Sequence, residues 1–307
     1  MGFIILTDSA CDLDRSMRQR YNVAEYFSGY MVDGDTRRKH DLDWENMTPD
    51  QFYGSMTKNH MYTSAITNAE ELRGFFGKYL AEGNDVLYLG LSSALSGTFA
   101  LVSKVREELL ETYPERKFIC VDTLRYSGAL ALLISLADEK RASGASIEET
   151  ASYIEDQKTK IHECGTVDDL FFLSKQGRVS NLAAFMGSLI ALKPIAEFDK
   201  QGSNYILGKV KGYNAMYKTV IGYMKETIED PHESTIFISC SNRKAQAEKL
   251  RELVMEEFAP REIVMTTLCQ ACGGAIGPGF VAVFYRGKRL SDDLSREQEI
   301  FNRVAAK

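Results

Sequence analysis

The sequence predicts an α/β protein whose N-terminal half contains a parallel sheet covered by helices on both faces. The chain has 307 residues, of which 44% are hydrophobic and 26% are charged. This length suits about two globular domains and a large core. Short apolar runs without polar alternation recur in the first half, as in strands buried on both faces. Helical segments follow these runs, which is typical of βαβ units.

The first half supplies the clearest elements. One predicted helix, at residues 96–113, has apolar side chains recurring on one face and charged side chains elsewhere. A second, at residues 127–141, ends at Ser143-Gly144. In chain order we expect a strand at 3–7, a helix at 68–80, a strand at 85–90, a helix at 96–113, a strand at 118–122 and a helix at 127–141.

The second half has a different pattern, and we place a domain boundary near residues 164–167. The predicted domains are residues 1–165 and 166–307, both α/β. The expected strands are 205–210, 235–240, 262–268 and 280–285, and the expected helices are 213–228 and 244–258. Residues 182–195 are very apolar, whereas the tail at 291–307 is polar and is predicted to form an appended helix.

Charge and hydropathy exclude several classes of protein. The net charge of −6 argues against a nucleic-acid binder, which needs a basic surface. The first residues have no basic segment before a long apolar one, so no secretory signal is visible. The longest apolar stretch, residues 182–192, is shorter than the roughly 20 residues that span a bilayer. We therefore expect a cytoplasmic protein without a membrane span.

Cysteine and histidine patterns do not predict a metal site or a cofactor. The six cysteines are scattered, which indicates reduced thiols. Cys269 and Cys272 form a single C-x-x-C, whereas a structural zinc site needs four ligands. The four histidines show no ligand spacing. No G-x-S-x-G, Walker A or G-x-G-x-x-G motif is present.

Hydroxyl and glycine residues follow the predicted strands and precede helices. The best example is Ser96-Gly97-Thr98, which could bind an anion with a hydroxyl and the N–H groups of a helix start. The alternative is that Ser96 or Thr98 only caps its own helix. A second cluster, Thr63-Ser64-Ala65-Ile66-Thr67, read alone is a loop leading into the next helix.

Basic residues surround two glycines in the second half. Lys175 and Arg178 flank Gly177, and Lys209 and Lys211 precede Gly212. These are either solvated charged turns or a patch that attracts an anion or an acidic partner surface.

Taken together, these motifs resemble the DegV family of bacterial fatty-acid-binding proteins. The resemblance extends from Phe3 to about Lys288, and the order and spacing of the motifs make it specific. The motifs that carry it are Thr7-Asp8-Ser9-Ala10, Thr63-Ser64-Ala65-Ile66-Thr67, Ser92-Ser93-Ala94-Leu95-Ser96-Gly97-Thr98-Phe99, Asp122-Thr123 with Ser127-Gly128-Ala129, Leu170 through Ser180, Gly187-Ser188-Leu189, Lys193-Pro194-Ile195, Gly208-Lys209-Val210-Lys211-Gly212 and Gly277-Pro278-Gly279.

The resemblance implies an N-terminal three-layer domain with a parallel sheet, a C-terminal α/β domain with a mixed sheet, and one long-chain fatty acid between them. Thr63 and Ser96 are expected to hold its carboxylate, with Ser64 and Gly97 beside them. Some members serve as the acyl-binding subunit of a fatty acid kinase, so an ATP-binding kinase subunit is an implied partner. The expected acyl-chain residues are Phe185, Met186, Leu189 and Ile190, and the expected partner-facing residues are Arg178, Lys209 and Lys211.

Three positions depart from the family pattern. Ala275 stands where members often have a histidine close to the carboxylate. The first loop has Ala65-Ile66-Thr67 in place of Gln-Pro-Ser, and Lys211 replaces an arginine that could form a bidentate contact. The alternative is therefore a binder of another amphipathic anionic lipid, with no kinase partner.

Overall fold

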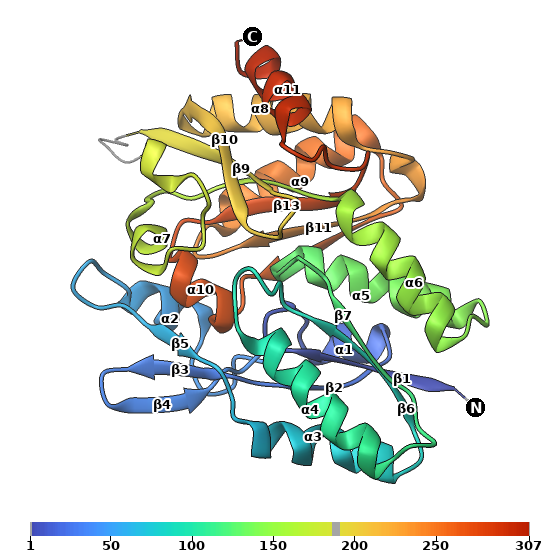
Figure 1. Cartoon of the computed structure of the whole chain (residues 1–307). Coiled ribbons are helices and arrows are strands. Elements are labelled where there is room, and N and C mark those ends of the chain that lie inside the picture. Colours follow the sequence, from blue (N-terminus) through green and yellow to red (C-terminus); the bar gives the residue numbers. More distant parts are fainter. Residues whose placement is uncertain (1, 186–190, 307) are drawn as a thin grey trace.

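The computed structural model describes residues 2–185 and 191–306 of the chain. It contains two main sheets, one from each half of the sequence, and Figure 1 shows them one above the other with α5 (Ser127–Ala142) and α10 (Gln270–Ile276) between them. The predicted fold class, a parallel-sheet domain followed by a domain with a mixed sheet, is confirmed.

The first sheet is parallel and has the order β2-β1-β6-β7. Its bounds are β1 (Phe3–Asp8), β2 (Val23–Phe27), β6 (Asp85–Gly90) and β7 (Phe118–Asp122). The three predicted strands are present. The edge strand β2 was not predicted, because Ala24 and Glu25 interrupt its apolar character.

Helices cover both faces of this sheet. The covering helices are α3 (Ala69–Ala81), α4 (Thr98–Thr112), α5 and α6 (Ile147–Gln157). On one face, Phe76 of α3 and Val102 of α4 pack with Val86 of β6. On the opposite face, Leu87 of β6 packs in the same cluster as α5. Adjacent residues of one strand thus contact different helix layers, as the alternation of a strand requires.

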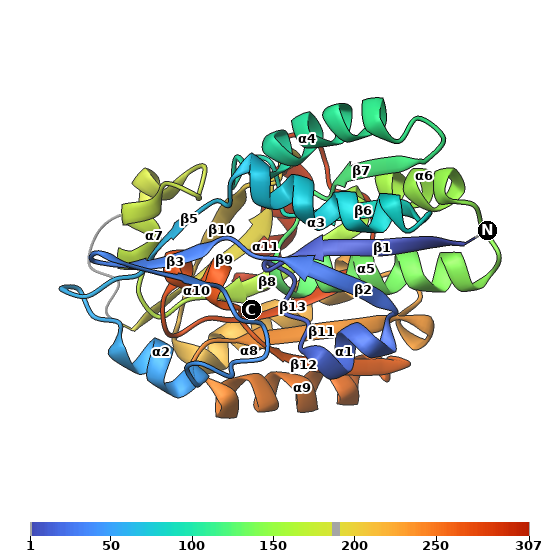
Figure 2. The same ribbon diagram turned by 90° about the horizontal axis from the view of Figure 1, so that it is seen from below.

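A small antiparallel sheet, in the order β4-β3-β5, follows β2. Its strands are β3 (Tyr30–Asp33), β4 (Thr36–Lys39) and β5 (Thr63–Ala65), and α2 (Pro49–Ser55) lies between the last two in sequence. Figure 2 shows these elements at the end of the molecule opposite the N-terminus. The cluster at residues 63–67, predicted to be a loop, therefore begins as a short strand.

The second sheet is mixed, with the order β10-β9-β8-β13-β11-β12, and among its described strands only β11 and β12 pair in parallel. Its strands are β8 (Ile161–Thr166), β9 (Leu192–Phe198), β10 (Asn204–Lys211), β11 (Thr235–Cys240), β12 (Glu262–Thr267) and β13 (Val281–Arg286). The boundary predicted after residue 165 falls within β8.

Helices of the C-terminal half cover this sheet on one side and α5 packs on the other. The covering helices are α8 (Gly212–Thr227), α9 (Lys244–Phe258) and α11 (Ser295–Ala305). Gly128 of α5 lies so close to the ring of Phe284 and to Phe237 that a Cβ at this position would clash with them. The helix therefore packs directly against the second sheet. No helix among residues 2–185 and 191–306 is long and apolar enough to cross a membrane.

Buried polar contacts join the two halves. The Asp12 carboxylate accepts hydrogen bonds from the Ser239 hydroxyl at 2.7 Å, the Cys269 backbone N–H at 2.8 Å and the Ser127 hydroxyl. Burial raises the pKa of Asp12 despite these donors. Three donors that would otherwise be unpaired in the interior are satisfied by one carboxylate, which fixes the relative placement of β1, α5 and β11.

Candidate functional site

A cavity that is partly open to solvent lies where the C-terminal ends of β1 and β6 approach α10 and α7 (Phe171–Gln176). We call it the outer cavity. Its lining residues come from both halves of the chain and include Asp8, Ser9, Phe27, His40, Ser64, Ile66, Leu91, Leu95, Ser96, Gly97, Thr98, Tyr126, Leu173, Gln176, Arg178, Asn204, Cys272, Ala275 and Ile276.

A second, smaller space, the inner cavity, adjoins the first and is lined mainly by residues of the C-terminal half. Both cavities are lined by Tyr126, Leu173, Asn204 and Ile276. The inner cavity is otherwise mostly apolar, and its other lining residues include Val167, Leu170, Val179, Pro194, Ala196, Ile206 and Phe280. The shared walls make the two cavities neighbouring parts of one site, with polar groups at the exposed end and aliphatic groups at the buried end.

Ser96 and Gly97 line the outer cavity at the start of α4. The Ser96 hydroxyl accepts the Thr98 N–H at 3.2 Å and lies 2.9 Å from the Thr98 hydroxyl. A Cβ at Gly97 would meet no atom within 4 Å, so this residue leaves the helix start open. Capping and anion binding, the two interpretations of this motif, are therefore compatible, because a hydroxyl has a donor as well as acceptor sites.

Ser64 lines the outer cavity, whereas Thr63 is not among its lining residues. Both belong to β5, in which successive side chains point to opposite faces. The Ser64 hydroxyl donates to the Ala271 carbonyl of α10 at 3.3 Å, and this bond links the small sheet to the C-terminal half. The structure thus brings Ser64, Ser96 and Gly97 together around one cavity and leaves Thr63 exposed beside it.

The three predicted partner-facing cations occupy two places. Arg178 is exposed and lines the outer cavity, and its guanidinium donates to the Leu95 carbonyl at 3.5 Å. Lys209 and Lys211 are exposed on β10 and do not line either cavity. Arg178 is therefore the one of the three whose charge acts on a group bound at the cavity mouth.

His40 is a lining residue that the sequence patterns did not identify. Its side chain is buried, with Nδ1 3.2 Å from the Ser9 hydroxyl, and its Nε2 has no hydrogen-bond partner in the described part of the chain. Burial, and secondarily the charge of Lys39, lowers the pKa of His40 to about 4. The imidazole is therefore neutral at pH 7, and one of its nitrogens is unpaired among the described residues.

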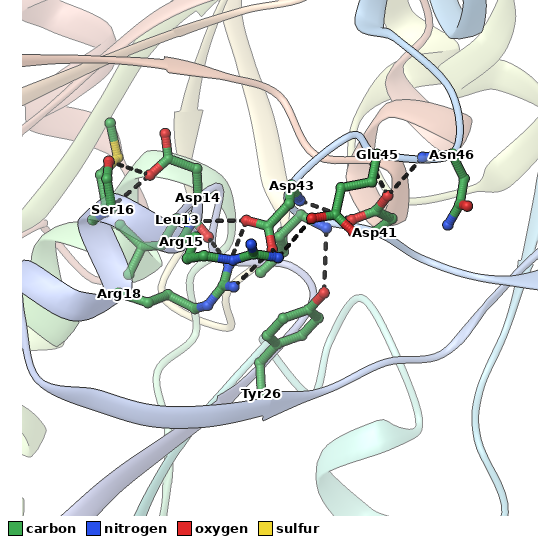
Figure 3. A network of polar contacts seen from close by, with 12 residues as sticks. Leu13, Asp14, Arg15, Ser16, Arg18, Tyr26, Asp41, Asp43, Glu45 and Asn46 are labelled. Carbon is green, nitrogen blue, oxygen red and sulfur yellow. Dashed lines mark hydrogen bonds and ion pairs between the residues drawn. The ribbon is translucent and has the colours of Figure 1, made fainter.

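The loop after His40 is held by the polar network shown in Figure 3. The Asp41 carboxylate accepts the backbone N–H groups of Asp43 at 2.9 Å, Glu45 at 2.7 Å and Asn46 at 3.1 Å. The Asp41 N–H itself donates to the Gln270 side chain of α10 at 2.9 Å. These bonds fix the backbone next to His40 relative to α10.

Asp8 is a second lining residue without a predicted role. Burial raises its pKa, although its carboxylate accepts hydrogen bonds from the Tyr88 hydroxyl at 2.7 Å and the N–H groups of Leu91 and Ala10 at 2.9 Å each. These donors satisfy the carboxylate, so its main effect is to fix the ends of β1 and β6 at the cavity floor.

The predicted acyl-chain residues are only partly described. Met186, Leu189 and Ile190 lie outside the described residues, and Phe185 ends a short 3₁₀ segment (Leu182–Phe185) whose last side chains are not described. Their role stays a prediction. Ala275, which departs from the family histidine, lines the outer cavity. In the described ranges, no group of three or more His, Cys, Asp or Glu side chains is arranged to hold a metal.

The fold and the site together define a class: an α/β protein with a parallel and a mixed sheet and a cavity lined by residues from both halves of the chain. Residues 3–288 match the family model described as "Uncharacterised protein, DegV family". A DegV domain-containing protein of Clostridium perfringens is 33% identical over 285 residues, which cover 93% of this chain and 97% of the relative. The chain belongs to the DegV family.

Solved structures share this fold. A DegV family protein from Thermus thermophilus, described by its fatty acid binding, has a TM-score of 0.84 and 23% identity, covering 94% of this chain and 100% of its own. A stearic acid-binding protein from Eubacterium ventriosum has a TM-score of 0.83 and 19% identity, with coverages of 94% and 99%.

Proposed function

We propose that the protein binds one long-chain fatty acid, with the carboxylate in the outer cavity and the acyl chain extending into the inner cavity. The observation that carries this proposal is the shared wall of the two cavities, which joins a hydroxyl-bearing mouth to an aliphatic interior. Fatty acid binding by the Thermus thermophilus and Eubacterium ventriosum proteins supports it.

The carboxylate has donors at the mouth. Ser96 contributes a hydroxyl to this cavity, and His40 contributes an Nε2 that has no partner among the described residues. Arg178 adds a positive charge, and Ser64 lies beside them with its hydroxyl bonded to the Ala271 carbonyl. Hydrogen bonds to a charged group are about twice as strong as neutral ones, so such a set offsets the cost of removing the carboxylate from water. Thr63, which was predicted to bind the carboxylate, is exposed beside Ser64 and does not line this cavity.

The acyl chain supplies most of the affinity. Each buried CH₂ contributes about 0.8 kcal/mol, so a chain of ~16 carbons gains on the order of 10 kcal/mol. This gradient of polarity favours a ligand with an ionised head group at the exposed end and an apolar tail at the buried end.

The test is mass spectrometry of an organic extract of the purified protein, followed by titration of the delipidated protein with palmitate. We expect one acyl chain per protein in the extract, or saturable binding of palmitate at one site. An extract without acyl chains, together with no binding of added palmitate or oleate, would contradict the proposal.

We further propose that the bound carboxylate is presented to an ATP-binding kinase subunit, in the cytoplasm. The mouth of the outer cavity includes exposed Gly97 and Arg178, and Lys209 and Lys211 add exposed positive charge in the C-terminal half. Reconstitution with a cognate kinase subunit and ATP should give acyl phosphate. Reversing the charges in a Lys209→Glu/Lys211→Glu variant should slow this reaction and leave palmitate affinity unchanged.

The second candidate is a carrier of another amphipathic anionic lipid without a kinase partner. Ala275 at the cavity favours it, because the imidazole common in the family is missing from this position. Identification of a different lipid in the extract, combined with no acyl phosphate from any cognate kinase subunit, would support this alternative over the first.

A further inference from the structure

The inner cavity contains two polar groups that an unsubstituted acyl chain would leave without partners. Glu163 of β8 and Asn204 of β10 both line it. They are 1% and 6% exposed, and neither Glu163 Oε2 nor Asn204 Oδ1 has a hydrogen-bond partner among the described residues. Most other groups around them are aliphatic. Unpaired polar atoms in such surroundings are destabilising, so their presence requires an explanation.

Tyr126 places both groups at the junction of the two cavities. Its hydroxyl donates to Glu163 Oε1 at 2.8 Å, and Asn204 interacts with the same hydroxyl. Tyr126 and Asn204 line the outer as well as the inner cavity. A chain that passes from the mouth into the inner cavity therefore passes this polar pair.

The hydrogen-bonding capacities of the pair define what would satisfy it. Burial raises the pKa of Glu163 to about 8, so its carboxyl is mostly protonated at pH 7. With Oε1 occupied by Tyr126, the carboxyl O–H on Oε2 is a free donor, and the Asn204 amide oxygen is a free acceptor. A hydroxyl group can accept one hydrogen bond and donate another, so its chemistry suits a free donor and a free acceptor.

We propose that the ligand is a fatty acid with a hydroxyl group along its chain, and that Glu163 and Asn204 bind this hydroxyl. The inference rests on the proposed fatty acid binding and names a narrower class of ligand for the same site. Inside an apolar cavity such a pair favours the substituted chain, because the unsubstituted chain buries both polar groups unpaired.

The experiment compares the affinities of the delipidated protein for stearate and for a set of monohydroxystearates that differ in the position of the hydroxyl. We expect at least one isomer to bind about 10-fold more tightly than stearate, which corresponds to ~1.4 kcal/mol. The Glu163→Leu variant should lose this preference and bind stearate at least as well as the wild type. The Glu163→Gln variant, which keeps a donor next to the same tyrosine, should retain a preference.

The outcomes separate this inference from the function on which it rests. Binding of stearate with no preference for any isomer would overturn the inference, since solvent would then satisfy the pair, and would leave fatty acid binding intact. No binding of stearate or of any isomer would overturn both. The comparison of isomers uses the wild-type protein, so it tests the preference for a hydroxylated chain even if the Glu163→Leu variant fails to fold.

Discussion

Replacing Ser96 by alanine tests the head-group site with the smallest change. The substitution removes one hydroxyl that lines the outer cavity and leaves the aliphatic lining untouched. A buried charged acceptor that loses one donor is destabilised by roughly 1–3 kcal/mol, which is about a 5- to 150-fold increase in the Kd for palmitate. The same hydroxyl accepts the Thr98 N–H, so the variant should also lose about 0.5–2 kcal/mol of folding stability.

Calorimetric titration with palmitate measures the affinity, and urea unfolding measures the stability. Ser93→Ala is the matched control, because Ser93 lies in the same loop, is exposed and does not line the cavity. Its Kd should equal that of the wild type. The reasoning is refuted if Ser96→Ala binds palmitate within 2-fold of the Ser93→Ala control, since the carboxylate would then lie elsewhere.

Three further variants test the buried histidine, the buried aspartate that joins the two halves, and the inner cavity. The pKa of His40 is about 4 in the folded protein and roughly 6.5 in the unfolded chain, so the free energy of unfolding should fall by about 2 kcal/mol between pH 6.5 and 5. Denaturant unfolding of His40→Gln should show a smaller loss over the same pH range. An equal loss would show that His40 does not cause the pH dependence. Asp12→Ala leaves three buried donors unpaired and should lower the free energy of unfolding by about 3 kcal/mol, whereas Asp35→Ala in an exposed turn should change it by under ~0.5 kcal/mol. Ala196→Phe narrows the inner cavity and should weaken palmitate binding while sparing laurate; equal weakening of both acids would place the chain outside this cavity.

Short apolar runs predicted three strands of the first sheet, whereas β8, which is buried along its whole length, was not predicted because His162, Glu163 and Thr166 interrupt its apolar character. Residues 3–7, 85–90 and 118–122 are mostly apolar, and they correspond to the central strands β1 and β6 and to the edge strand β7. In contrast, β4 consists of Thr36, Arg37, Arg38 and Lys39, all exposed. A strand without a buried face has no hydrophobic period, so its place depends on pairing with β3, which a local pattern does not contain.

The site was predictable only where its residues belong to a local sequence motif. Ser96, Gly97 and Ser64 lie in hydroxyl-rich segments at element ends, and the structure places all three on the outer cavity. His40 stands alone in a charged segment, and its burial follows from tertiary contacts with Ser9 and Gly29. Glu163 gives no signal in the sequence, because a single carboxylate is not part of a motif. Its unpaired oxygen becomes visible only after the surrounding side chains are placed.

The central claim is that one chain occupies both cavities with its acid group at the mouth. The most direct measurement is a crystal structure of the protein with a fatty acid brominated at its terminal carbon, located by anomalous scattering. The account predicts the carboxylate within hydrogen-bonding distance of the Ser96 hydroxyl and the bromine among the side chains of Val167, Val179 and Ile206. Bromine at the surface, or a carboxylate remote from Ser96, would contradict it.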